Sequence, residues 1–218
     1  MDSVKNGGQG LLFANTRTSA AKLAVDSGPP IEKILSKNEL NELLKISKKI
    51  LANNEHTQLV KKLAFVVKQG VAFHHAGLNQ KCREIIENEF RSGKIKLLSA
   101  TPTLAAGVNL PARRVVISSV LRYNSQYGGN VPISVLEYKQ LCGRAGRPQY
   151  DDEGESIIIG KNNQELLLER YVDGEPEPIE SKIINPRSLR IHLLSLIVTS
   201  PSITEAVSYT HLRAHETS

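Results

Sequence analysis

Short apolar runs alternate with longer amphipathic stretches along most of the chain. The apolar runs lie at residues 10–15, 71–74, 95–99, 114–120 and 154–159. Runs of this length, bounded by turn residues and rich in β-branched side chains, are typical of buried strands. Strands that alternate with helical stretches predict a parallel sheet with helices on both faces, which is an α/β fold.

The region between the first two strands is expected to be helical. Ser36 and Glu39 have the spacing of a capping box, and an apolar stripe follows them. A second stripe predicts a helix over residues 58–68. The Gly-Pro-Pro sequence at residues 28–30 is expected to end the preceding helix, which the pattern places at residues 20–25.

Apolar positions at helical spacing predict three more helices, at residues 79–92, 134–143 and 189–198. The Gly-Glu-Pro-Glu-Pro stretch at residues 174–178 reads as an acidic, turn-rich linker before the last of these. The length of 218 residues suits one domain followed by part of a second.

The composition and the apolar runs indicate where in the cell the protein is located. No apolar run reaches the roughly 18 residues that a membrane span needs, and the first residues have no apolar signal core. Cys82 and Cys142 form no metal-ligand pattern, which favours free thiols in a cytoplasmic, intracellular protein without a membrane partner.

Charge is unevenly distributed along the C-terminal half. Residues 111–150 contain six Lys or Arg and one acid, whereas residues 151–180 contain ten acids and two bases. We interpret the basic block as a phosphate-facing surface and the acidic block as a face turned away from it. Two ordinary solvated faces are the alternative.

The sequence Gln-Leu-Cys-Gly-Arg-Ala-Gly-Arg-Pro at residues 140–148 carries the clearest chemistry. Arg144 and Arg147 each follow a glycine and stand three residues apart. Guanidinium groups stay charged and match phosphate oxygens in shape, and glycine permits close approach of a bulky anion. Two fixed positive charges aimed at a polyphosphate are expected here.

Two further motifs precede it, Phe-His-His-Ala-Gly-Leu at residues 73–78 and Ala-Thr-Pro-Thr-Leu-Ala-Ala-Gly-Val-Asn-Leu-Pro-Ala at residues 100–112. In this order the three motifs resemble the C-terminal motor domain of superfamily 2 helicases, in particular archaeal DNA repair helicases of the HelQ/Hjm type. The resemblance covers residues 11–206. It implies a RecA-like sheet domain followed by a winged-helix domain.

By this resemblance, Arg144 and Arg147 are arginine fingers that reach the γ-phosphate of ATP. The nucleotide and its Mg²⁺ would be held mainly by a preceding motor domain. Residues implied in ATP binding or coupling are Gln140, Gly107, Asn109 and Gly143. The chain has no Gly-x-x-x-x-Gly-Lys-Ser/Thr phosphate loop and no Asp-Glu-x-His box. We therefore expect the isolated chain to be inactive without that first motor domain.

The resemblance also implies contacts with single-stranded or forked DNA. The implied residues are Arg17, His74, His75, Gly77, Thr101 and Thr103. The two histidines have no suitably spaced partner, so we expect no metal site. Tyr123 and Tyr127 flank a Gly-Gly turn signal that favours a β-hairpin, which in such helicases separates strands; a surface loop is the alternative.

The predicted organisation is a motor domain over residues 1–180, with a helical insertion at about 29–69. The start of a truncated winged-helix domain follows at 181–207, and a non-native tail at 208–218. The expected function is 3′–5′ DNA unwinding in repair or fork processing, by a protein that is monomeric at full length. A non-catalytic nucleic-acid-binding module and an RNA helicase motor are the alternatives.

Overall fold

The computed structural model describes residues 2–104, 108–124, 127–147, 150–160, 164–178 and 186–199. Gly107 and the expected non-native tail at 208–218 lie outside these ranges. The chain divides into two compact units, Met1–Pro176 and Glu177–Ser218. The candidate site residues all belong to the first unit.

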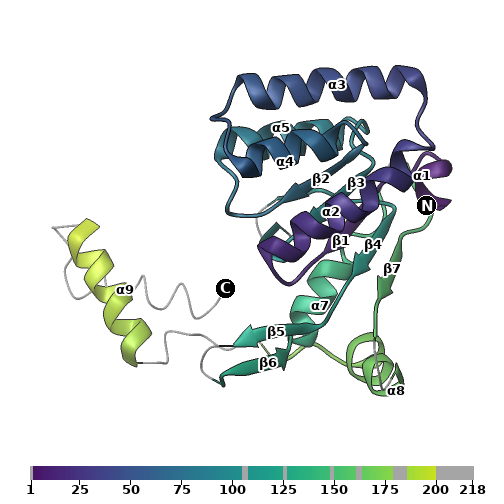
Figure 1. Cartoon of the computed structure of the whole chain (residues 1–218). Coiled ribbons are helices and arrows are strands. Elements are labelled where there is room, and N and C mark those ends of the chain that lie inside the picture. The colour runs from purple at the N-terminus through teal and green to yellow at the C-terminus, as the bar shows by residue number, and fades with distance from the viewer. Residues whose placement is uncertain are drawn as a thin grey trace. The chain divides into compact units, whose positions relative to one another are not determined.

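The first unit is built on a five-stranded parallel sheet with the order β2-β3-β1-β4-β7 (Figure 1). The strands are β1 (Gly10–Phe13), β2 (Val71–His74), β3 (Leu97–Ala100), β4 (Arg114–Ile117) and β7 (Glu155–Ile158). Every residue of β2 and β3 is buried, as expected for parallel strands that helices cover on both faces. The predicted α/β class is confirmed.

Helices cover this sheet and extend beyond one edge of it. They are α1 (Asp2–Lys5), α2 (Arg17–Glu32), α3 (Lys37–Ala52), α4 (Gln58–Val67), α5 (Gln80–Arg91), α7 (Val135–Cys142) and α8 (Gln164–Leu167). The connection from β1 to β2 leads across the sheet in one direction, and the connections to β3, β4 and β7 lead in the other. Right-handed crossovers therefore place α2 on one face and α5 and α7 on the other. Helix α3 packs on α4 and α5, as an added layer (Figure 1).

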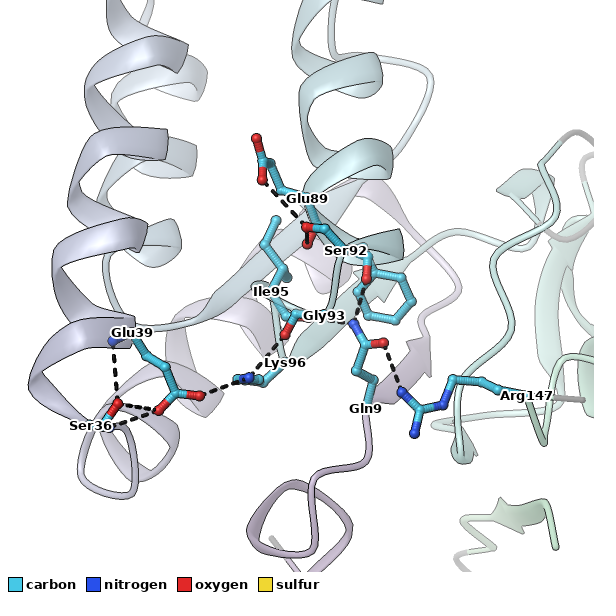
Figure 2. Close-up of polar contacts among 10 residues, drawn as sticks. Gln9, Ser36, Glu39, Glu89, Ser92, Gly93, Ile95, Lys96 and Arg147 are labelled. Carbon is cyan, nitrogen blue, oxygen red and sulfur yellow. Dashed lines mark hydrogen bonds and ion pairs between the residues drawn. The ribbon is translucent and has the colours of Figure 1, made fainter. Parts of the chain in front are cut away.

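Hydrogen-bonding side chains define where the helices begin. Among the described helices of the first unit, the five longer ones start after a residue whose side chain accepts a backbone N–H three positions on: Thr16, Ser36, Thr57, Asn79 and Ser134. The predicted capping box is present at Ser36 and Glu39. Lys96 also binds Glu39 at 2.9 Å and, together with Ser36, lowers the pKa of that carboxyl to about 2 (Figure 2). This contact ties the start of α3 to the start of β3.

The prediction that Gly-Pro-Pro ends the first helix is wrong. Helix α2 continues through Pro29 and Pro30 to Glu32. The fixed φ of proline is compatible with a helix, but each ring removes one N–H donor and crowds the carbonyl four residues earlier, so the last turn needs support from packing. Ile31 is 4% exposed, and α2 packs on β2 and β3. Tertiary packing therefore keeps the last turn helical.

The sequence pattern also missed a π-helix, η1 (Leu168–Asp173), whose Tyr171 is 1% exposed. The Tyr171 hydroxyl donates to the Ile133 carbonyl at 2.9 Å, and its ring packs against Tyr138 of α7. This contact holds the segment after β7 against α7.

In the second unit the described element is helix α9 (Pro186–Thr199), which exposes Ile191, Leu194 and Ile197. Among the described residues, no helix combines the length and the apolar character that crossing a membrane requires.

Helix α4 offers a matched pair of substitutions for testing the core. Leu63 is 0% exposed and Phe65, on the same helix, is 54% exposed. We expect Leu63→Ala to lower the free energy of unfolding by about 2–5 kcal/mol, because it leaves a cavity. Phe65→Ala should change it by less than about 1 kcal/mol. Urea denaturation followed by circular dichroism measures both, and equal losses would contradict this packing.

Candidate functional site

The carboxyl ends of the strands bring most of the predicted strand-binding residues to one edge of the sheet. Arg17 opens α2 after β1, His74 ends β2, and Thr101 follows β3. His74 and Ala100 are register partners, and the Thr101 N–H donates to the His74 carbonyl at 3.2 Å. The Thr101 and Thr103 hydroxyls are hydrogen-bonded to each other at 3.0 Å. Motifs far apart in the sequence therefore meet here.

Gly77 lies on this edge beside His75 and Arg17. Its N–H donates to His75 Nδ1 at 3.1 Å, and the His75 ring stacks on Phe73. A Cβ atom at Gly77 would lie 3.1 Å from the His75 ring and 3.5 Å from Arg17 Cδ. A side chain at this position would crowd the His75 ring and contact Arg17, so glycine keeps the surface beside Arg17 open.

Both histidines are buried, which governs their charge. His74 Nε2 lies 2.8 Å from Glu87 Oε1 on α5. Burial lowers the pKa of His74 more than the hydrogen bond and charge of Glu87 raise it. Burial also lowers the pKa of His75, and the charge of Arg17 adds to that effect. The histidines therefore shape this edge as neutral rings, and Arg17 supplies its positive charge.

A two-stranded hairpin extends from the same edge, as predicted. Strands β5 (Leu121–Asn124) and β6 (Gly129–Pro132) pair antiparallel. The Asn15 side chain donates to the Leu121 carbonyl, and Arg122 is ion-paired with Glu137 of α7. Tyr123 and Tyr127 are 66% and 76% exposed. The base of the hairpin is thus fixed to the domain, and both aromatic rings face solvent.

Arg144 and Arg147 lie at the opposite, amino edge of the sheet. The Gly146 N–H donates to the Ala112 carbonyl at 2.7 Å, and the Ala112 N–H donates to the Arg144 carbonyl at 2.9 Å. Ala112 precedes β4, so these bonds attach the arginine motif to the start of that strand. Gly146 has a φ of 89°, a backbone conformation that favours glycine over other residues.

Arg144 meets the motif that follows β3. Its Nη1 donates to Asn109 Oδ1 at 2.8 Å. Gly143 is the C-cap of α7 and is exposed beside Arg144. Gln140 is also exposed and lines a cavity of about 300 Å³ together with Thr103. Gln140 thus lies on α7, Gly143 ends that helix, and Asn109 contacts Arg144, the residue that follows.

Arg147 has two partners that sequence reasoning missed, Asp151 and Gln9. Asp151 accepts from Nε at 2.7 Å and from Nη2 at 2.8 Å, and Gln9 Oε1 lies 3.2 Å from Nη1. The spacing of four residues between Arg147 and Asp151 could have indicated that pair. Nothing in the sequence pattern pointed to Gln9.

These contacts correct the interpretation of the charge blocks. Asp151 binds Arg147, and Glu155 binds Arg114 at 2.5 Å. At these two positions the start of the acidic block pairs with the basic block and does not lie on a separate face. Parallel pairing of β4 with β7 brings them together.

A parallel sheet with polar loops at one edge and an arginine motif at the other defines a RecA-like domain of the helicase class. The chain belongs to the family described as "Helicase conserved C-terminal domain", whose model matches residues 2–149.

Similar proteins share the name "ATP-dependent DNA helicase Hel308". The chain is 46% identical over 200 residues to the one from Methanocella arvoryzae, covering 91% of this chain and 27% of the relative. It is 41% identical over 199 residues to the one from Pyrococcus horikoshii, again covering 91% and 27%. It is 38% identical over 219 residues to the one from Caldivirga maquilingensis, covering 96% and 28%. The chain thus spans little more than a quarter of these relatives.

The buried histidines predict a pH dependence of stability. The pKa values of His74 and His75 lie below the ordinary 6.5 in the folded protein, so the unfolded chain binds protons first as pH falls. Their contribution is therefore complete above pH 6.5 and is lost as pH falls below 6.5 toward the folded pKa values. We expect the urea midpoint to decrease from about pH 7 to about pH 5.

Substituting His74→Gln and His75→Gln together should flatten this decrease, and the exposed His56→Gln variant is the control. Glu39, with its pKa near 2, loses its stabilising contribution only below its ordinary value of 4.5 and does not contribute in this window. An unchanged slope in the double variant would contradict the assignment.

Proposed function

We propose that this chain is the second motor domain of an ATP-dependent DNA helicase that moves 3′ to 5′ along one strand. The observation that carries the proposal is the hydrogen bond between Arg144 and Asn109. Asn109 lies on the segment that begins at Thr101, on the strand-binding edge, and ends at Ala112, on the arginine edge. One stretch of chain therefore connects the two sets of residues.

ATP would lie between the arginine edge and a first motor domain, which would hold Mg²⁺ and orient the attacking water. Arg144 would stabilise the charge that develops on the γ-phosphate, with Arg147 as the second guanidinium. A phosphate bound by Arg144 would compete with Asn109 for the same N–H group. Nucleotide binding at this edge would then release or shift the segment at residues 108–112.

The other edge would hold the sugar–phosphate backbone of the tracked strand. Arg17 would supply a charge-assisted contact. Because the Thr101 and Thr103 hydroxyls share one hydrogen bond, one of the two would keep its hydrogen to donate to a phosphate oxygen. Gly77 would let the backbone approach closely. These contacts read no bases, which suits a motor that must move along any sequence.

The hairpin would act as a wedge where the duplex opens. Its base is fixed to β1 through Asn15 and to α7 through Arg122, while Tyr123 and Tyr127 are exposed. An aromatic ring stacked on the last base pair contributes roughly 1–3 kcal/mol per base. A rigid base with exposed rings is what strand separation requires.

Arg144→Ala tests the nucleotide role. The assay uses a chimera in which this chain replaces the matching 200 residues of the Methanocella arvoryzae relative. We expect kcat for DNA-stimulated ATP hydrolysis to fall by on the order of 10³–10⁵-fold, because the γ-phosphate loses a guanidinium. Binding of single-stranded DNA, measured by fluorescence anisotropy, should change little.

The matched control is Arg170→Ala, because the exposed Arg170 guanidinium stacks on Tyr171 rather than facing the arginine motif. An Arg144→Ala chimera that hydrolyses ATP at the parent rate would refute the proposed function.

Replacing Tyr123 and Tyr127 with alanine in the same chimera tests the wedge. We expect the rate of unwinding of a forked duplex to fall about tenfold or more, since two stacking surfaces are lost. ATP hydrolysis should stay within about twofold, because the arginine edge is untouched. Phe65→Ala, which removes an exposed ring from α4, is the control. Equal losses of unwinding and hydrolysis would count against the wedge.

A further inference from the structure

The domain holds the Arg147 side chain on several sides. Its side chain is 17% exposed and lines a cavity of about 400 Å³ together with Gln9, Leu110, Pro111 and Tyr150. The guanidinium also lies 5.5 Å from the centre of the Tyr150 ring. A side chain restrained in this way is set in one orientation before any ligand arrives.

Asp151 provides the main restraint. It accepts three N–H groups of Arg147: the backbone N–H at 3.1 Å, Nε at 2.7 Å and Nη2 at 2.8 Å. The Asp151 side chain is only 4% exposed. In return, the Asp151 N–H donates to the Arg147 carbonyl at 3.0 Å. Arg147 and Asp151 are therefore joined by hydrogen bonds of both their backbones and their side chains.

Gln9 provides the second restraint, from the sheet itself. It is 4% exposed and directly precedes β1, the central strand. Its Nε2 donates to the carbonyls of Phe90 at 2.6 Å and Ile95 at 2.7 Å. Both amide hydrogens are thus used, which fixes Oε1 toward Arg147 Nη1 at 3.2 Å (Figure 2).

The guanidinium keeps donors for a ligand. A guanidinium has five N–H groups, and Asp151 and Gln9 accept from Nε, Nη2 and Nη1, one hydrogen each. Within the described residues this leaves one hydrogen on each terminal nitrogen. Those two hydrogens match two phosphate oxygens.

We propose that Asp151 and Gln9 are positioning residues that hold Arg147 in place for its contact with the γ-phosphate. This inference rests on the proposed function. An opposite role, in which Asp151 withholds Arg147 from the nucleotide, would require the pair to separate. Separation would break two charge-assisted hydrogen bonds to Asp151, at 2.7 Å and 2.8 Å, together with the contact to Gln9. We therefore expect Arg147 to contact the γ-phosphate while it stays paired with Asp151.

The test is a double-mutant cycle between Arg147 and Asp151 in the chimera. Asp151→Asn keeps the size of the side chain but removes its charge and one of the two oxygens that accept from the Arg147 guanidinium. We expect kcat for ATP hydrolysis to fall by roughly 10–100-fold, as for a displaced catalytic group. The KM for ATP should change less than about threefold, because the contact acts in the transition state. In an Arg147→Ala background, Asp151→Asn should cause no further loss.

Asp152→Asn is the matched control, since Asp152 is the exposed next residue, and it should keep the parent kcat. A rise in kcat with Asp151→Asn would show that Asp151 withholds Arg147, and would overturn the proposal. An equal loss in both backgrounds would show a merely structural role and would also overturn it. Full activity of Asp151→Asn beside an inactive Arg144→Ala chimera would refute the positioning while leaving the proposed function intact.

Thermal melting of each variant shows whether it folds. If Asp151→Asn unfolds, Arg147→Lys tests the same contact, because lysine keeps the charge but cannot form two parallel bonds to a carboxylate. We expect Arg147→Lys to lose 10-fold or more in kcat, on the scale of a displaced catalytic group. Parent activity of that variant would refute the need for a held guanidinium.

Discussion

Parallel pairing of all five strands is the constraint on which the rest of this domain depends. Each connection must return the chain to the same end of the sheet, so loops before the strands gather at one edge and loops after them at the other. Arg17, His75 and Thr101 therefore share one edge, whereas Gln9, Ala112 and the arginine motif share the other. In the proposed function, this separation would hold the nucleotide and the DNA strand at opposite edges of one domain.

Two of the connections that cross between the edges carry predicted site residues at both ends. The segment from Thr101 to Ala112 buries Leu104, Leu110 and Ala112 in the core. At one end Thr103 is hydrogen-bonded to Thr101, and toward the other end Asn109 accepts from Arg144. Helix α7 follows the same direction from the base of the hairpin to the arginine motif. Close-packed cores transmit displacement rather than absorb it. In the proposed function, these two connections would be the route by which one edge affects the other.

Electrostatics at the arginine edge depends on neighbours as much as on the arginines themselves. Arg144 interacts with the neutral amide of Asn109, whereas Arg147 is paired with the carboxylate of Asp151. The carboxylate lowers the net charge around Arg147 but fixes its geometry, and it raises the pKa of a group that is already permanently charged. The two guanidinium groups of one motif thus have different described partners, an amide for Arg144 and a carboxylate for Arg147.

Much of this protein could be determined from its sequence alone. Apolar periodicity located all five strands, Ser36 and Glu39 located a helix start, and Gly128 with Gly129 located the hairpin turn, because each signal acts over a few neighbouring residues. Tertiary structure decided the rest. Packing on the sheet keeps Pro30 in a helix. Gln9 is hydrogen-bonded to Arg147, which lies 138 residues later in the sequence. A partner that distant exists only once the strands between have paired, so local pattern holds no trace of it.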